Sequence, residues 1–367
     1  MEKTARNYGI DLLRIIAMFF VIVLHCLGRG GILRNATLNS TSFKAAWLLE
    51  IIAYCAVDIF ALISGYVSYN KKTKAKNYIN LWFQVVFYCL LTVVVFNIFN
   101  PSIVTGKDYI RSFFPVTKNL YWYFTAFTGL YLLKPILDKA INNMEEKDLK
   151  KVFIVILIGY SIVDTFIKRF TLEGGYTVIW LAILYILGAI IHKCEIGKKM
   201  KLYQSLIGIS ILVLITYLVK IYGTGNINFL KDTFGITINS DLLINYTSIT
   251  VLGIAILFII GFSKIEFNNI SKKIIGFGAS SAFTIYLLNN HYFTWNNIML
   301  DLFKDIANDS VLKIYGYVIG FSLVFVIGSI LIDKVRIFIF KGLKIDKLSE
   351  KISNLLDNCV TKISNNI

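Results

Sequence analysis

The sequence predicts an all-α integral membrane protein with about ten transmembrane helices. Hydrophobic residues make up 56% of its 367 residues and charged residues only 16%. The mean hydropathy of +0.67 lies far outside the range of soluble globular domains. Ten segments of about 17 to 24 residues carry few charges, and each is long enough as a helix to cross roughly 30 Å of hydrocarbon. They lie near residues 10–28, 46–68, 78–99, 119–136, 152–167, 176–191, 203–222, 242–262, 276–300 and 311–332.

Basic residues are divided unevenly between the two sets of loops that these spans define. When loops are assigned to alternate sides, 24 Lys and Arg residues fall on the side that holds both termini and ten on the other. Because basic loops stay in the cytoplasm, both termini are expected there, with an even number of spans. The net charge of +16 therefore follows the membrane topology and does not indicate nucleic acid binding.

The chain is expected to divide into a membrane domain, residues 1–333, and a cytoplasmic tail, residues 334–367. From Lys334 to Leu356, lysines alternate with Ile, Phe and Leu at mostly helical spacing, which is typical of a basic amphipathic helix on the inner leaflet. The longest outer loop, about residues 223–241, could serve as a lid or an acceptor contact, with a simple connection as the alternative.

The first span carries three polar residues, Asp11, Arg14 and His25, where apolar residues are expected. Each helical residue advances about 100° and 1.5 Å, so Arg14 and His25 lie within roughly 20° of one face and about 16 Å apart. A charge at mid-bilayer costs about 2.5 to 3.5 kcal/mol on insertion scales, so this face should meet protein or a wet cavity. It is therefore the first candidate for a functional site.

Two later spans carry candidate partners for this face. If the second span enters from outside, Glu50 falls at about the depth of His25, and Asp58 lies between the depths of His25 and Arg14. In the ninth span, His291 is as far from the inner end as His25 is in the first. The two histidines are therefore expected to share a depth.

These residue types favour proton transfer beside an anion-binding group. A histidine can take and return a proton near neutral pH, and Asp58 or Glu50 could fix its tautomer. Arg14 lies about one turn from the cytoplasmic end, close enough to meet a phosphate-bearing cofactor. Two structural alternatives stay open. Arg14 could simply pair with Asp11, three residues earlier, and His25 could be a buried, hydrogen-bonded histidine that joins two spans.

Four motifs follow one another in a recognisable order. Arg14 is separated from His25 by ten residues. At residues 58–66 an aspartate is followed by apolar residues and Ser-Gly-Tyr. At residues 120–135 an aromatic run leads to Leu-Leu-Lys-Pro, and at residues 281–287 a serine leads to Ile-Tyr-Leu. Together they resemble the membrane-bound acyltransferases known as acyltransferase family 3, and they cover the chain from about residue 10 to 300. The ten expected spans also fit that family's fold.

The last motif departs from the family pattern. The family usually has a histidine three residues after the tyrosine, whereas here Tyr286 is followed by Asn289 at that position and His291 two residues later. His291 could substitute from the next turn or only line the cavity.

The resemblance implies transfer of an acyl group, most often acetyl from acetyl-CoA, to a hydroxyl of a cell-surface polysaccharide or its lipid-linked precursor. It implies that Arg14, with Lys71 and Lys72, meets the CoA phosphates, although membrane topology alone explains the two lysines. His25 would be the general base or a transient acyl carrier, and Asp58 a further catalytic residue. The supporting residues expected around them are Asp11, Glu50, Ser64, Trp122, Tyr286, Asn289 and His291. Trp122 has an alternative as part of an interfacial aromatic belt.

We therefore expect an O-acetyltransferase of a bacterial plasma membrane, with membrane lipid and a surface glycan as partners. No metal is expected because the five cysteines lack the paired spacing of a zinc site, and a homodimer is left open.

Two other classes of protein could also use some of these residues. A proton-coupled transporter could use the intramembrane Asp, Arg and His residues, but the sequence shows neither repeats nor proline-broken spans in both halves. A non-catalytic sensor or assembly factor would not need Arg14 and His25, although Asn289 leaves some room for it.

Overall fold

The computed structural model describes residues 6–168, 170–223 and 239–364, and within those ranges it is helical without any strand. Five stretches are long and apolar enough to cross a membrane: Tyr8–Asn35, Thr41–Ser68, Ala75–Phe99, Leu202–Tyr222 and Val311–Gly342. The all-helical membrane character is thus confirmed. Of the other predicted spans, residues 119–136 fall largely in a continuous 22-residue helix that is not among these five, and the rest are shorter or interrupted helices. The count of ten and the side of each terminus therefore stay predictions. Most of the outer loop expected at 223–241 lies outside the described residues.

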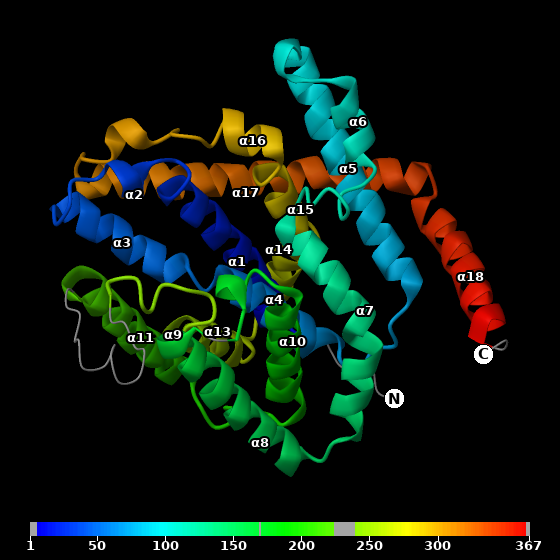
Figure 1. Cartoon of the computed structure of the whole chain (residues 1–367), viewed down its shortest axis with the longest axis horizontal. Coiled ribbons are helices and arrows are strands. Elements are labelled where there is room, and N and C mark those ends of the chain that lie inside the picture. The colour runs from blue at the N-terminus through cyan, green and yellow to red at the C-terminus, as the bar shows by residue number, and fades with distance from the viewer. Residues whose placement is uncertain (1–5, 169, 224–238, 365–367) are drawn as a thin grey trace.

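The helices follow one another along the chain from blue at the N-terminus to red at the C-terminus (Figure 1). Their bounds are α1 Tyr8–Leu27, α2 Ile32–Asn35, α3 Thr41–Ala53, α4 Ala56–Ser68, α5 Ala75–Phe99, η1 Pro101–Ile103, α6 Gly106–Ser112, α7 Trp122–Asn143, α8 Glu146–Ile156, η2 Leu157–Ile162, α9 Val163–Ile167, η3 Glu173–Gly175, α10 Val178–Lys193, α11 Leu202–Tyr222, α13 Ile249–Phe262, α14 Asn269–Ala279, α15 Ala282–Asn289, α16 Tyr292–Asn297, η4 Lys304–Ile306, α17 Val311–Gly342 and α18 Ile345–Ser364.

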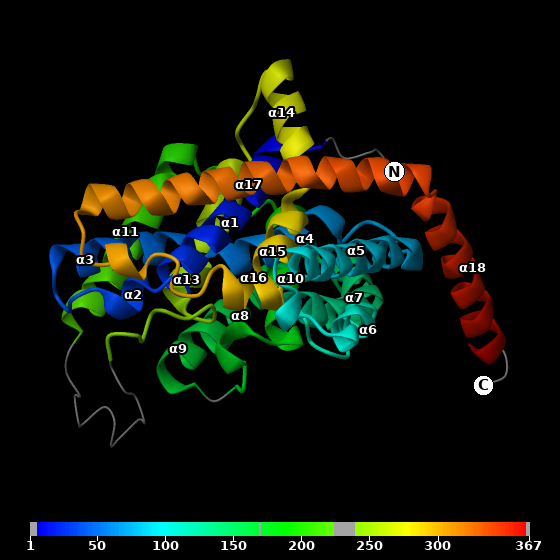
Figure 2. The same ribbon diagram turned by 90° about the horizontal axis from the view of Figure 1, so that it is seen from above.

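The first helix, α1, lies at the centre of the bundle. It packs against α3, α4, α13, α14, α15 and α17, and Figures 1 and 2 show these neighbours around it. The Asn7 side chain caps its first turn by accepting a hydrogen bond from the backbone N–H of Ile10 at 3.1 Å. Because neighbouring helices surround α1, its polar side chains meet protein and cavities, as the insertion cost of a charge requires.

Two predicted spans are broken. The second span is divided at Tyr54 and Cys55 into α3 and α4, and the ninth is divided into α14, α15 and α16. At the last break His291 leaves the helical conformation, and its Nδ1 accepts a hydrogen bond from the backbone N–H of Phe293 at 3.3 Å, which caps α16. The polar residues that marked this span in the sequence therefore interrupt the helix.

Helices α4 and α10 make a close backbone contact in the core. A Cβ atom placed on Gly65 of α4 would lie 1.9 Å from the carbonyl oxygen of Tyr185, and one on Gly188 of α10 would lie 2.0 Å from that of Leu62. Small residues that let two backbones approach in this way are typical of helix packing in membranes. This contact fixes α4, which carries Asp58 and Ser64, against the rest of the bundle.

The tail helix begins later than predicted. Residues 334–342 continue α17, and the separate helix α18 starts at Ile345, so the expected start at Lys334 is wrong. The cause is pairing with the bundle: buried Asp333 accepts hydrogen bonds from Tyr88 Oη and Arg336 Nε, both at 2.8 Å, and Lys334 donates to the carbonyl of Phe277 at 2.6 Å. These contacts hold the end of α17 against the bundle.

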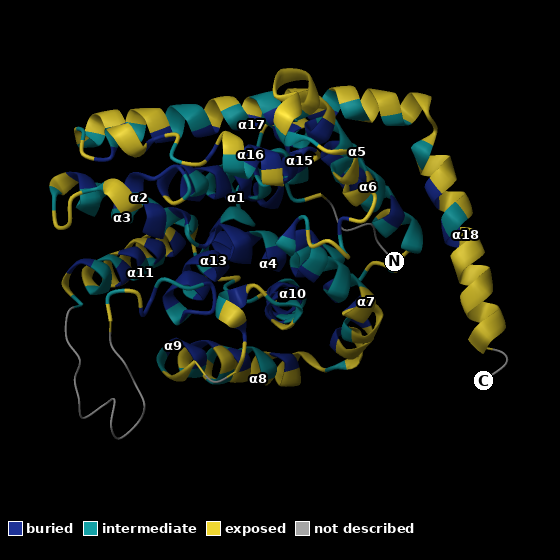
Figure 3. Cartoon of the chain, turned by 45° about the horizontal axis from the view of Figure 1, so that its top comes forward, coloured by how far each residue is buried: buried dark blue, intermediate teal, exposed yellow. Residues whose placement is uncertain are grey.

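Helix α18 extends from the bundle and is largely exposed (Figure 3). Its first turns lie beside α5, where Lys76 Nζ donates to Asp346 at 2.8 Å and to Glu350 at 3.2 Å. The hydrogen bond from Lys76 lowers the pKa of the Asp346 carboxyl. Exposed pairs of this kind contribute little stability, so these two ion pairs alone do little to hold α18 against α5.

Candidate functional site

His25 lies near the end of α1 and is paired with a residue 264 positions later. Its Nδ1 forms a hydrogen bond with Oδ1 of Asn289, the last residue of α15, and the edge of its ring meets Trp295 with the ring centroids 4.7 Å apart. An amide oxygen can only accept, so Nδ1 carries the proton. Nε2 is therefore left unprotonated and able to accept one.

The expected pairing of His25 with a carboxylate is wrong. Asp58 accepts a hydrogen bond from Trp180 Nε1 at 3.1 Å, and its second oxygen has no hydrogen-bond partner among the residues that the structure describes. One oxygen of Glu50 is likewise buried and unpartnered there. Asn289 occupies the position that the sequence assigned to a carboxylate. Depth along a helix nominates candidate partners, but it does not determine which way a side chain points.

A cavity of about 320 Å³ surrounds His25. Most of its wall is aromatic, contributed by Phe60, Trp122, Tyr123, Tyr176, Tyr246, Phe283, Tyr286 and Trp295. Trp122 packs on Tyr176 with ring centroids 4.5 Å apart, and Tyr176 packs on Tyr246 at 5.2 Å. The aromatic run at the start of α7 therefore lines a cavity, which the interfacial-belt alternative does not explain.

Tyr286 presents an available proton to this cavity. Its hydroxyl oxygen accepts hydrogen bonds from the backbone N–H of Tyr123 at 3.3 Å and from Nδ2 of Asn290 at 3.0 Å. A hydroxyl has one proton of its own to donate. Because both contacts use the oxygen as acceptor, that proton remains available to a bound group.

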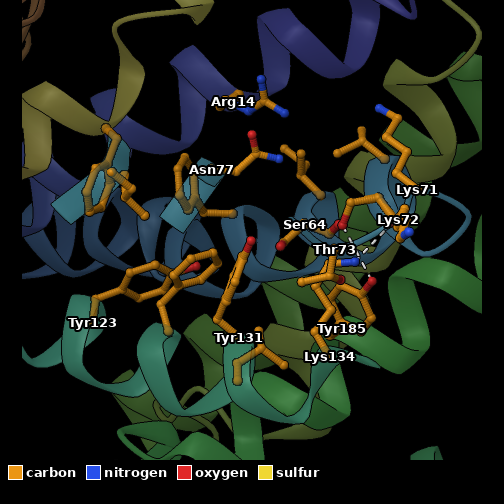
Figure 4. A pocket seen from close by; sticks show the side chains of 18 residues that line it. Arg14, Ser64, Lys71, Lys72, Thr73, Asn77, Tyr123, Tyr131, Lys134 and Tyr185 are labelled. Carbon is orange, nitrogen blue, oxygen red and sulfur yellow. Dashed lines mark hydrogen bonds between the residues drawn. The ribbon is translucent and has the colours of Figure 1, made fainter. Parts of the chain in front are cut away.

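A second cavity, of about 340 Å³, begins at Arg14 (Figure 4). Figure 4 shows Arg14 on one side of it and Tyr123 and Tyr131 of α7 on the opposite side. Ser64, Lys71 and Lys72 also line it. The two cavities share three wall residues, which are Phe60, Tyr123 and Phe283. The Arg14 and His25 cavities are therefore neighbours separated by aromatic side chains.

Arg14 also forms the ion pair that the sequence allowed as its alternative. Its Nη1 lies 3.2 Å from a carboxylate oxygen of Asp11, whose other oxygen is paired with Arg6 at 2.5 Å. The ion pair is therefore present, and the Arg14 side chain still lines the cavity, so the expected contact with a phosphate-bearing cofactor stays a prediction.

A buried polar cluster at the far end of the Arg14 cavity was missed from the sequence. Lys134 and Asp138 form an ion pair at 2.6 Å, Lys134 also donates to the carbonyl of Ser68 at 3.1 Å, and Tyr185 Oη donates to Asp138. The available signal was a Lys and an Asp four residues apart at the inner end of the fourth span.

His291 does not join His25. It lines a third cavity, of about 790 Å³. Asn290 and Trp295 belong to the walls of both the third cavity and the His25 cavity, so these two residues separate the two cavities. With Nδ1 used to cap α16, His291 is a wall residue, the second of the two alternatives considered for it.

The comparisons with known proteins give one match. A family model described as an acyltransferase domain matches residues 7–333. No curated protein matches the chain, and no solved structure does either.

Proposed function

Because the chain belongs to acyltransferase family 3, we propose that it moves an acyl group, in the first instance acetyl, from acyl-CoA to a hydroxyl of a cell-surface polysaccharide or its lipid-linked precursor. One observation carries the proposal. His25 has its Nδ1 engaged by Asn289 and its Nε2 unprotonated, and it lies in a cavity beside the cavity of Arg14. In this proposal His25 is a base beside the Arg14 cavity, whose rim carries cationic side chains. The family assignment does not favour a transporter.

The Arg14 cavity suits the donor. Arg14, Lys71 and Lys72 are cations at its rim, and guanidinium and ammonium groups bind phosphates well. A phosphate-bearing carrier anchored there could extend its thioester arm past Phe60 and Tyr123 toward His25. The distance along α1 is about 16 Å at 1.5 Å per residue. In this proposal the rim faces the cytoplasm, as the positive-inside rule expects, and the membrane is a bacterial plasma membrane.

The chemistry follows from the protonation of His25. Nε2 accepts the proton of the acceptor hydroxyl while the hydroxyl oxygen forms a bond to the thioester carbonyl carbon. The carbon–sulfur bond then breaks, and the departing CoA thiolate takes the proton from Nε2. Tyr286 can donate its free proton to the carbonyl oxygen as negative charge develops there. In a second route, Nε2 bonds to the thioester carbonyl carbon as the carbon–sulfur bond breaks and CoA leaves as its thiolate. The acceptor hydroxyl oxygen then bonds to the same carbon, the carbon–Nε2 bond breaks, and the hydroxyl proton is released to solvent.

Asn289 is proposed to position His25, and kinetics can distinguish this role from a purely structural one. Asn289→Ala frees the His25 tautomer and is expected to lower kcat by roughly 100-fold, with the KM for acetyl-CoA unchanged. Asn289→His restores the family's usual residue, which can accept the same Nδ1 proton, and should stay within roughly tenfold of wild type. Steady-state transfer of labelled acetyl measures both. A rise in KM with unchanged kcat in Asn289→Ala would contradict the assignment.

The donor site is tested by transfer of radiolabelled acetyl from acetyl-CoA to polysaccharide in membranes. Lys71→Gln combined with Lys72→Gln should raise the KM for acetyl-CoA about tenfold with little change in kcat, because phosphate contacts far from the thioester mainly affect binding. Lys139→Gln combined with Lys147→Gln is the matched control, since both lysines are exposed, one in the last turns of α7 and one in the first turn of α8, on the same expected side. Equal KM values for the two double variants would exclude phosphate binding at this rim.

A further inference from the structure

The third cavity, beyond Trp295, has a concentration of positive charge that membrane topology does not explain. Lys107 and Arg111 from α6 and Lys118 from the following loop all line it. The positive-inside rule accounts for lysines in the inner loops, but these three lie on the expected outer side, where basic residues are scarce. Three of the ten basic residues assigned to that side therefore gather around one cavity.

Most of this charge is uncompensated. Asp108 is the one acidic residue in the wall, and its oxygens already accept from the backbone N–H of Thr105 at 2.8 Å and lie 3.5 Å from Arg111. Neither Lys107 nor Lys118 forms an ion pair within the described part of the chain. A concave surface lined with one sign of charge attracts ions of the opposite sign.

The cations of α6 face the cavity and not the lipid. Lys107 and Arg111 are four residues apart and thus share one face of the helix. Ile110, Phe113 and Phe114 of the same segment are exposed and do not line this cavity, which suits contact with the membrane interface. A lipid headgroup would be expected on the apolar side of α6, so the cavity side is left for a different anion.

This cavity also leads to the candidate base. Asn290 and Trp295 belong to its wall and to the wall of the His25 cavity. The Trp295 ring touches the ring of His25, with the centroids 4.7 Å apart. A molecule seated in the third cavity is therefore one side chain away from His25, on the opposite side from Arg14.

We propose that the third cavity binds the acceptor through its negative charges, so that the acceptor is an anionic glycan carrying phosphate or carboxylate groups. The inference rests on the proposed function and deepens it by naming the acceptor class. Lys107, Arg111 and Lys118 hold the anionic groups while a neighbouring sugar reaches past Trp295 with its hydroxyl toward Nε2 of His25. Aromatic rings such as Trp122 and Tyr176 give that sugar flat apolar surfaces to lie on.

The test is direct binding, which does not depend on catalysis. The full-length protein in detergent is titrated with fluorescent oligo(glycerol phosphate), a flexible polyanion, and with fluorescent dextran of similar length. The wild type should bind the polyanion with an affinity that falls as salt rises, and it should bind dextran at least tenfold more weakly. Lys107→Gln combined with Lys118→Gln should weaken polyanion binding about tenfold, which corresponds to about 1.4 kcal/mol.

The matched control is Lys44→Gln combined with Lys304→Gln, which removes the same charge from the same expected side but from outside the cavity. It should bind the polyanion as the wild type does. Equal losses in the two double variants, or equal binding of dextran and polyanion, would overturn the inference. So would a Lys107/Lys118 variant that binds the oligomer normally and has lost only phosphatidylglycerol from nanodiscs, because the occupant would then be lipid.

Failure of the proposed function gives a different result. In that case the polyanion binds as described, but the wild type moves no acetyl to any acceptor. If transfer occurs and the polyanion does not bind, the proposed function stands and the inference about the acceptor is wrong.

Discussion

Replacing His25 by alanine is expected to lower acyl transfer by about 1,000-fold, which is within the usual contribution of a general base. The expectation rests on the hydrogen bond to Asn289, which leaves Nε2 as an acceptor in a cavity beside that of Arg14. No other described side chain in the wall of the His25 cavity is a histidine or a carboxylate. The measurement is the initial rate of labelled acetyl transfer at equal amounts of inserted protein.

The control for this prediction is His25→Gln. Glutamine is of similar length and can donate a hydrogen bond to Asn289, but it cannot take up a proton near neutral pH. It should keep the thermal midpoint of the wild type and show the same loss of rate as alanine. Full activity in either variant would exclude His25 as base and as acyl carrier.

Gly65→Ala is expected to destabilise the protein by about 3 kcal/mol, at the upper end of the usual effect of overpacking. The added Cβ would lie 1.9 Å from the carbonyl oxygen of Tyr185, so α4 and α10 must separate. In an unhindered helix the same change stabilises by up to about 1 kcal/mol, because alanine has the higher helix propensity. At Gly65 the steric cost of the added Cβ must therefore exceed the gain in helix propensity.

Gly316→Ala makes the same substitution where nothing crowds it. Gly316 lies in α17, and no atom comes within 4 Å of a Cβ built there. The thermal midpoint in detergent should fall for Gly65→Ala and stay level or rise for Gly316→Ala. Equal midpoints would show that α4 and α10 do not need this close contact.

The sequence was most informative about the membrane class and about α1. Apolar composition predicted an all-helical membrane protein, and the ordered motifs predicted the family that the family model confirms. Helical geometry placed Arg14 and His25 on one face, and each lines one of two adjacent cavities. These predictions succeed because they depend on local periodicity and on the cost of a charge in hydrocarbon, both of which can be evaluated within one helix.

The pairing of residues across helices could not be predicted. Depth nominated Asp58 and Glu50 as partners of His25, whereas the partner is Asn289, which the sequence placed only among the supporting residues. The depth of a residue along its helix gives one coordinate of its side chain, and the rotation of the helix about its own axis gives the other. That rotation depends on packing, as at Gly65 and Gly188, where two backbones touch.

Breaks within apolar segments were also beyond the sequence. Hydropathy treats residues 46–68 and 276–300 as continuous spans, but each is interrupted, and the second break is capped by His291. The end of α17 was misplaced for a related reason. Lys334 and Arg336 have the composition of a surface tail, yet contacts with Phe277 and Asp333 keep them in the helix.

Transfer across the membrane can be tested with sealed vesicles in which the purified protein separates donor from acceptor. [¹⁴C]acetyl-CoA is supplied on the side of Arg14, and a glycan is enclosed on the side of the third cavity. Label should appear on the enclosed glycan with the wild type and not with His25→Ala. If the glycan is labelled only when it is on the same side as acetyl-CoA, the Arg14 cavity and the third cavity do not serve donor and acceptor from opposite faces, and the proposed arrangement is wrong.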